Sequence, residues 1–137
     1  MKKVLFIFIV AMIFSNRVDS QTMYFSTSYK QECWWNESSG KYENCTGNDE
    51  SSLFKLNSEQ TMFHHTTEKI SSDYYVSKHE YDKDNDVYTY DVKSDAGNTY
   101  FFIIDLKKNQ VRIVGNNKTS NQKTYMHIYT VKKSWTE

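Results

Sequence analysis

Residues 87–106 read VYTYDVKSDAGNTYFFIIDL, and this stretch decides the fold. In its first half, two tyrosines and Val92 alternate with polar residues, which is the period of a half-buried strand. Its second half, residues 100–106, is apolar on both faces over five residues, as in a strand that is central in its sheet. The turn-forming residues 95–98 separate the halves. The stretch therefore predicts two antiparallel strands joined by a hairpin.

The same alternation of short strands and turns extends in both directions along the chain. From about residue 58 onward, turn-forming clusters recur about every 12 residues, a spacing typical of all-β sandwiches and barrels. The composition agrees, because 16% of the residues are aromatic and proline is absent. We expect an all-β fold, an antiparallel meander of about seven or eight strands that forms a curved sheet or a small up-and-down barrel. Besides the two strands above, the expected strands are residues 23–35, 42–47 or 52–57, 60–67, 73–81, 111–114 and 125–131.

One segment, residues 58–67, is compatible with a strand or with a short helix. Asn57 is followed three residues later by Gln60, which matches a helix-capping box. Threonines and a pair of histidines follow, and these are mediocre helix formers. The balance favours a strand.

The N-terminus has the pattern of a cleaved secretory signal. Lys2 and Lys3 precede an apolar run over residues 4–14, and Val18 and Ser20 supply the residues before the cut. The run is too short to span a bilayer, and no later stretch is apolar enough to do so. We expect residues 1–20 to be removed and residues 21–137 to form a single domain outside the cytoplasm, either extracellular or periplasmic.

Two cysteines, Cys33 and Cys45, lie in the expected mature chain. An exported chain meets an oxidising environment, so an even pair predicts a disulfide. Gly40 lies near the midpoint between them, and a hairpin turning there would place the cysteines opposite each other on neighbouring strands. We expect one hairpin of the domain to be closed by this bond.

The charge of residues 21–137 excludes one class of partner. The expected signal holds three of the 17 basic residues and one of the 17 acidic residues, which leaves a net charge of about −2. Nucleic-acid binders normally carry a basic surplus, so no nucleic-acid partner is expected.

No motif predicts catalysis, a metal or a cofactor. His64 and His65 are adjacent, so on a strand they point to opposite faces, and neither the spacing of a strand metal site nor that of a helical one is present. Asp82, Asp84 and Asp86 have the spacing of the first three ligands of a calcium-binding loop. The loop's sixth position, which needs glycine, is Val87, and its twelfth, which needs glutamate, is Lys93. A Gly-x-Ser-x-Gly motif is missing as well. We expect a protein that is not an enzyme.

The remaining candidates are aromatic. Trp34 and Trp35 are adjacent, so on a strand one would face the core and the other would face outward, where it could anchor a partner together with Tyr42. This suggests a secreted interaction module that docks on a protein or a surface glycan. A plain structural domain with neither role is a further alternative.

A second hypothesis places a ligand inside the sheet. The strand number and hairpin rhythm resemble those of the lipocalin-like barrels, which enclose one small apolar ligand. The resemblance is limited to the architecture. The Gly-x-Trp motif of that family does not occur near the first expected strand. The surplus of aromatic residues supports this hypothesis, because Tyr88, Tyr90, Tyr125 and Tyr129 supply hydroxyls that could orient a ligand.

Overall fold

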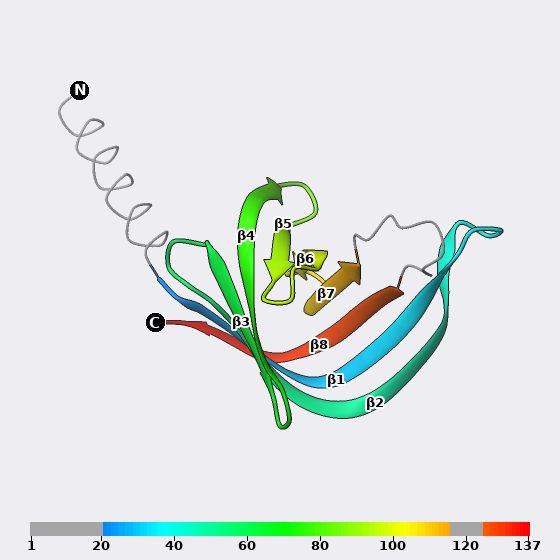
Figure 1. Cartoon of the computed structure of the whole chain (residues 1–137), viewed down its shortest axis with the longest axis horizontal. Helices are drawn as coiled ribbons and strands as arrows, with labels where there is room; N and C mark the ends of the chain where they lie inside the picture. Colours follow the sequence, from blue (N-terminus) through cyan, green and yellow to red (C-terminus); the bar gives the residue numbers. More distant parts are fainter. Residues whose placement is uncertain (1–20, 116–124) are drawn as a thin grey trace.

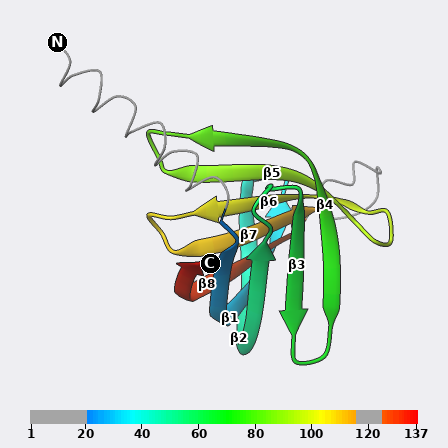
Figure 2. The ribbon, with the colours of Figure 1, turned by 90° about the vertical axis from the view of Figure 1, so that its left-hand side faces the viewer.

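The computed structural model describes residues 21–115 and 125–137, and within them the chain forms a closed antiparallel barrel of eight strands (Figures 1 and 2). The predicted cleavage site and signal, residues 1–20, lie outside the described residues. The strands are β1 (Met23–Asn36), β2 (Lys41–Leu56), β3 (Met62–Thr67), β4 (Ser71–Asp82), β5 (Val87–Ser94), β6 (Thr99–Asp105), β7 (Gln110–Gly115) and β8 (Tyr125–Thr136). The predicted all-β meander is confirmed.

Each strand pairs with the next one in sequence, and β8 pairs with β1 to close the barrel. This last pairing is long, running from Met23 opposite Thr136 to Trp34 opposite Tyr125. Figure 1 shows β8, β1 and β2 as three long curved strands lying side by side. The first and last described segments also meet, because Thr22 and Glu137 exchange two backbone hydrogen bonds of 2.9 Å. Closure of the sheet therefore depends on residues about one hundred positions apart.

The segment after Asn57 forms a turn followed by strand β3, so the preference for a strand is confirmed. Oδ1 of Asn57 accepts hydrogen bonds from the backbone N–H groups of Thr61 (2.8 Å) and Met62 (3.0 Å). Gln60 adopts the left-handed region with φ of 57°. The residues that match a capping box therefore close a tight turn. The two alternatives for the second strand, 42–47 and 52–57, belong to the single strand β2.

A bulge in β1 allows the barrel wall to bend. The pairing of β1 with both of its neighbours shifts register between Thr27 and Tyr29. Beyond the shift, Tyr29 lies across the backbone of Gly47 on β2, and a Cβ atom at position 47 would lie 1.9 Å from the Tyr29 hydroxyl oxygen. Any larger residue at position 47 would thus require the end of the Tyr29 side chain to move.

The core fills one end of the barrel. Its buried side chains come from all strands except β4, whose Tyr74 and Val76 pack against them half-buried. Gln60, in the turn between β2 and β3, accepts a hydrogen bond of 3.1 Å from the Tyr90 hydroxyl and so ties that turn to the core. The core residues are Phe25, Phe54, Leu56, Phe63, Tyr90, Val92, Phe102, Ile104, Val111, Ile113 and Tyr129.

Candidate functional site

A cavity of about 700 Å³ that is open to solvent lies beside the turn between β3 and β4. Its walls come from strands that are distant in sequence, namely β1, β2, β3, β4 and β8, so the site exists only in the closed barrel. Its lining is mostly polar, charged or hydrogen-bonding aromatic, and among the described residues Ile70 supplies its one aliphatic side chain. The lining residues are Ser28, Lys30, Asp49, Glu50, Ser51, His65, Thr67, Glu68, Lys69, Ile70, Ser72, Tyr74, His127 and Tyr129.

His65 of β3 forms the aromatic wall of the cavity where it meets the core. The side chain faces inward because it lies on the same face of β3 as buried Phe63. Its ring stacks on Phe54 with centroids 4.0 Å apart, and it meets Tyr129 edge to face at 5.3 Å. Only 8% of the residue is exposed, and its Nε2 atom is buried without a hydrogen-bond partner among the described residues. Burial, aided by the positive charge of nearby Lys30, lowers the pKa of His65 to about 4.

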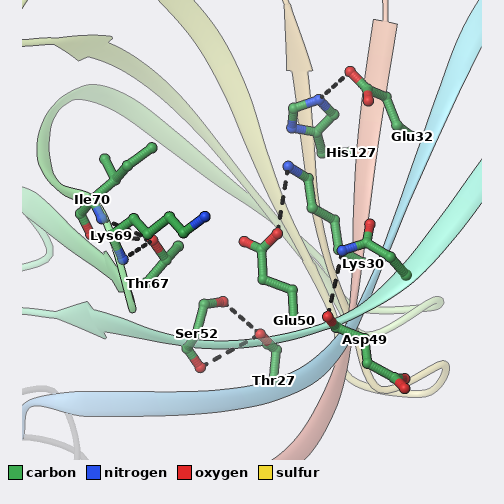
Figure 3. A network of polar contacts seen from close by, with 11 residues as sticks. Thr27, Lys30, Glu32, Asp49, Glu50, Ser52, Thr67, Lys69, Ile70 and His127 are labelled. Atoms are coloured by element: carbon green, nitrogen blue, oxygen red, sulfur yellow. Dashed lines mark hydrogen bonds and ion pairs between the residues drawn. The ribbon is translucent and has the colours of Figure 1, made fainter.

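Tyr129 of β8 lies between His65 and a lysine. The ammonium group of Lys30 on β1 lies 5.9 Å from the centre of the Tyr129 ring, because the two residues are opposite each other across the β1–β8 pair. Lys30 Nζ faces the Glu50 carboxylate at 4.0 Å (Figure 3). Burial raises the pKa of Tyr129, and Glu50 adds to that effect, so the phenol stays protonated.

His127 lies two residues before Tyr129 on β8, so the two side chains share one face of the strand. Nε2 of His127 lies 3.0 Å from Oε1 of Glu32, which is its partner across the β1–β8 pair (Figure 3). Burial lowers the pKa of His127, and the hydrogen bond with Glu32 partly offsets that effect. The bond to the carboxylate orients the imidazole, since a neutral ring with its proton on Nε2 donates to Glu32.

The opposite wall contains Tyr74 of β4. Its ring packs on core residue Phe102 with centroids 4.7 Å apart, and burial raises the pKa of its phenol. The cavity is thus bounded by aromatic rings that are held by the core and by charged side chains nearer to solvent. Such an arrangement can stack a flat molecule and offer it hydrogen bonds at several edges.

The predicted ligand-lining tyrosines separate into different regions. Tyr129 lines the cavity. Tyr90 belongs to the core, and Tyr88 packs against the core while stacking on exposed Tyr81 at 4.3 Å. Tyr125 lies beside His127 with ring centroids 4.8 Å apart, but it does not line the cavity.

The predicted disulfide between Cys33 and Cys45 is present and joins β1 to β2. The expectation that one of Trp34 and Trp35 faces the core is wrong, because both are 38% exposed. They belong to the far end of the β1–β2 hairpin, which extends beyond the core (Figure 1). Trp34 packs on Tyr125 with centroids 6.0 Å apart, and Trp35 packs on Tyr42 at 5.0 Å.

Sequence reasoning missed His65, Lys30, Glu50 and Tyr74 as lining residues. One available signal was the alternation in β3, which places His65 on the same face as Phe63. Glu50 continues the alternation of Ser52 and Phe54 in β2, so the same kind of signal was available for it. Lys30 carried no such signal, because the shift in register near Tyr29 changes which residues of β1 face inward.

Three residues on the outer face resemble a catalytic triad. Ser71 Oγ lies 3.1 Å from Nε2 of His64, whose Nδ1 is hydrogen-bonded to Asp73. Acyl transfer also needs N–H donors aimed at a developing oxyanion. The backbone N–H groups just before Ser71, those of Lys69 and Ile70, already donate to Thr67 Oγ1. These two N–H groups are therefore engaged within the turn.

In the acidic turn with the calcium-loop spacing, the carboxylates of Asp82 and Asp86 accept hydrogen bonds from nearby residues. Asp82 accepts from the backbone N–H groups of Asp84 and Asn85, and Asp86 accepts from the Tyr81 hydroxyl at 2.6 Å. In the part of the chain that the structure describes, no three His, Cys, Asp or Glu residues are placed to hold a metal ion. Within the same residues, no helix is long and apolar enough to cross a membrane.

Comparison of the chain with protein-family models, with curated proteins and with solved structures finds no match.

Proposed function

We propose that this chain is a secreted, non-catalytic binding barrel that carries one small, flat, hydrogen-bonding molecule in the cavity. The observation that supports this most directly is the buried Nε2 atom of His65, which has no partner among the described residues. The great majority of buried polar atoms are hydrogen-bonded, and one that is not calls for a missing partner. A ligand group in the cavity would supply it.

The lining also favours a different ligand from the apolar molecule that the lipocalin-like architecture implies. A fatty-acid chain needs a long aliphatic wall, whereas Ile70 is the one aliphatic residue that contacts this cavity. The rings of His65, Tyr74 and Tyr129 are suited to stacking. The volume of about 700 Å³ falls within the range of small-molecule sites.

Two matched variants on one strand test the proposal. The oxidised protein, residues 21–137, is titrated with N-phenyl-1-naphthylamine, a neutral aromatic dye, and with 1-dodecanol, a neutral aliphatic chain. We expect saturable binding of one dye per chain and much weaker binding of dodecanol. His65→Phe keeps the stack on Phe54 but removes the hydrogen-bonding nitrogen, whereas His64→Phe changes the outer face of the same strand. We expect only His65→Phe to alter dye affinity, and absence of dye binding by the folded protein would overturn the proposal.

A second role, docking on a protein or surface glycan, is favoured by the exposed Trp34 and Trp35 on the projecting hairpin. Aromatic residues are common anchors at interfaces. A Trp34→Ala/Trp35→Ala variant and the parent protein would be compared for binding to a glycan array. Selective loss of glycan binding by the variant would support docking, and absence of binding by the parent would remove the glycan form of this role.

A further inference from the structure

Two groups that can donate hydrogen bonds, the Lys30 ammonium group and the His65 imidazole, lie near one aromatic ring, that of Tyr129. Lys30 Nζ lies 5.9 Å from the centre of the Tyr129 ring, and the His65 ring meets the same ring edge to face with centroids 5.3 Å apart. Both residues line the cavity. A group that lies against the Tyr129 ring would therefore lie near both an ammonium group and an imidazole.

From this placement we propose that the ligand carries a carboxylate, which binds between Lys30 and His65. The inference rests on the proposed function, because it names the chemical class of the molecule in the same cavity. In the bound state one carboxylate oxygen would accept a hydrogen bond from the ammonium group of Lys30. The other would accept one from the N–H at Nε2 of His65, and the aromatic part of the ligand would lie along Tyr129 and Tyr74.

The charge of Lys30 is incompletely satisfied without a ligand. Its side chain is only 22% exposed, and its closest carboxylate oxygen, that of Glu50, is 4.0 Å away. Charge-assisted hydrogen bonds of this kind are normally about 2.7–2.9 Å long. Figure 3 shows the Glu50 carboxylate pointing toward Lys30, while the Asp49 carboxylate is directed away from it. A ligand carboxylate would thus meet one competing acid at Lys30.

Of the groups that act on the pKa of His65, Lys30 carries a permanent positive charge, and together with burial it lowers that pKa. The neutral imidazole can place its proton on Nε2 and donate it. An anion bound beside Lys30 would be attracted by the same ammonium charge that disfavours protonation of the ring.

A series of three probes with one ring system tests the charge preference. The probes are 1-naphthylacetate, its neutral amide 1-naphthylacetamide, and the cation 2-(1-naphthyl)ethylamine, and their affinities are measured by calorimetry at pH 7.5. We expect the carboxylate to bind about tenfold or more tightly than the amide, which corresponds to one strong charge-assisted hydrogen bond. The amine should bind most weakly. Binding of the carboxylate should also raise the pKa of His65 in an NMR titration.

Variants at position 30 separate a specific contact from a general charge effect. Lys30→Met should bring the affinities of carboxylate and amide within about twofold of each other, whereas Lys30→Arg should preserve the difference. Lys133→Met, on β8 but outside the cavity lining, is the control and should leave the difference nearly unchanged. Lys69→Met tests the other lysine that lines the cavity.

The outcomes distinguish this inference from the proposed function. Equal binding of carboxylate and amide, or tightest binding of the amine, would overturn the carboxylate inference while leaving a binding barrel. Loss of the preference in Lys69→Met but not in Lys30→Met would overturn the assigned position. If none of the three probes binds to protein that is folded by circular dichroism, both the inference and the proposed function fail.

Discussion

The imidazole ring of His65 lies flat on the ring of Phe54, with centroids 4.0 Å apart and planes inclined by 3°. The two residues are opposite each other across the β2–β3 pair, so the stack is a cross-strand contact. Phe54 is completely buried. The stack therefore fixes a titratable ring at the boundary between the packed core and the cavity, and several consequences can be measured.

The first prediction concerns the pH dependence of stability. The pKa of His65 is lowered from 6.5 to about 4 in the folded protein, so between these values the unfolded chain binds more protons and stability falls as the pH falls. The loss is on the order of 3 kcal/mol and is complete near pH 4. The lowered pKa of His127 acts in the same direction. Urea unfolding between pH 4 and 7 measures the dependence.

The matched pair of histidine variants isolates the contribution of His65. In His65→Phe the slope of unfolding free energy against pH should become clearly smaller. His64→Phe, on the outer face of the same strand, controls for the replacement of a histidine by phenylalanine in β3. An unchanged slope in His65→Phe would show that the ring is not held neutral in the folded state.

The second prediction concerns Gly47. Its alanine variant places a Cβ atom where the Tyr29 hydroxyl lies, at 1.9 Å, and 2.6 Å from the adjacent ring carbon. Displacing the end of that half-buried side chain should lower the free energy of unfolding by about 1 kcal/mol. In a Tyr29→Ser background the same glycine substitution should cost much less. Additive effects of the two substitutions in urea unfolding would contradict the contact.

The third prediction concerns the disulfide. Cys33 and Cys45 close a short loop in the hairpin that projects beyond the core. The double Cys33→Ser/Cys45→Ser variant should lose roughly 3 kcal/mol of stability on the chain-entropy model. The near-UV circular dichroism of Trp34 and Trp35 should weaken, while the far-UV β signal stays, because the β1–β8 closure does not depend on the bond. Collapse of the far-UV signal under native conditions would contradict this separation.

The fourth prediction concerns the cluster of Ser71, His64 and Asp73. Because the N–H groups of Lys69 and Ile70 are already engaged, we expect no acyl-enzyme. Hydrolysis of p-nitrophenyl acetate by the parent protein should be no faster than by Ser71→Ala. A burst of nitrophenolate together with acetylated Ser71 in a mass spectrum would show that the cluster is catalytic.

Local patterns were enough to predict most of the wall of the barrel. The alternation around Tyr90 and the apolar run around Phe102 reflect the two-residue period of a strand, which is a property of neighbouring residues. The hairpin that brings Cys33 and Cys45 together followed from Gly40, whose φ of 65° is easily adopted by glycine. Inward and outward positions in β3 could be assigned in the same way.

The residues of the cavity were a different problem, because they come from strands that become neighbours only through closure. Lys30 and Tyr129 are opposite each other across β1 and β8. No local sequence pattern predicts this pairing. The bulge near Tyr29 then reverses the face to which the following residues of β1 point, since one extra residue in a strand moves every later side chain to the other side.

By itself, the sequence determined an all-β meander of hairpins with one disulfide, because strand period, turn residues and cysteine pairing act over short separations. Only the tertiary structure decided that the sheet closes, that both tryptophans are exposed, and that His65 shares a cavity with Lys30. The physical reason is that these properties depend on register between strands far apart in the chain. That register is set by the packing of the whole core and not by any one segment.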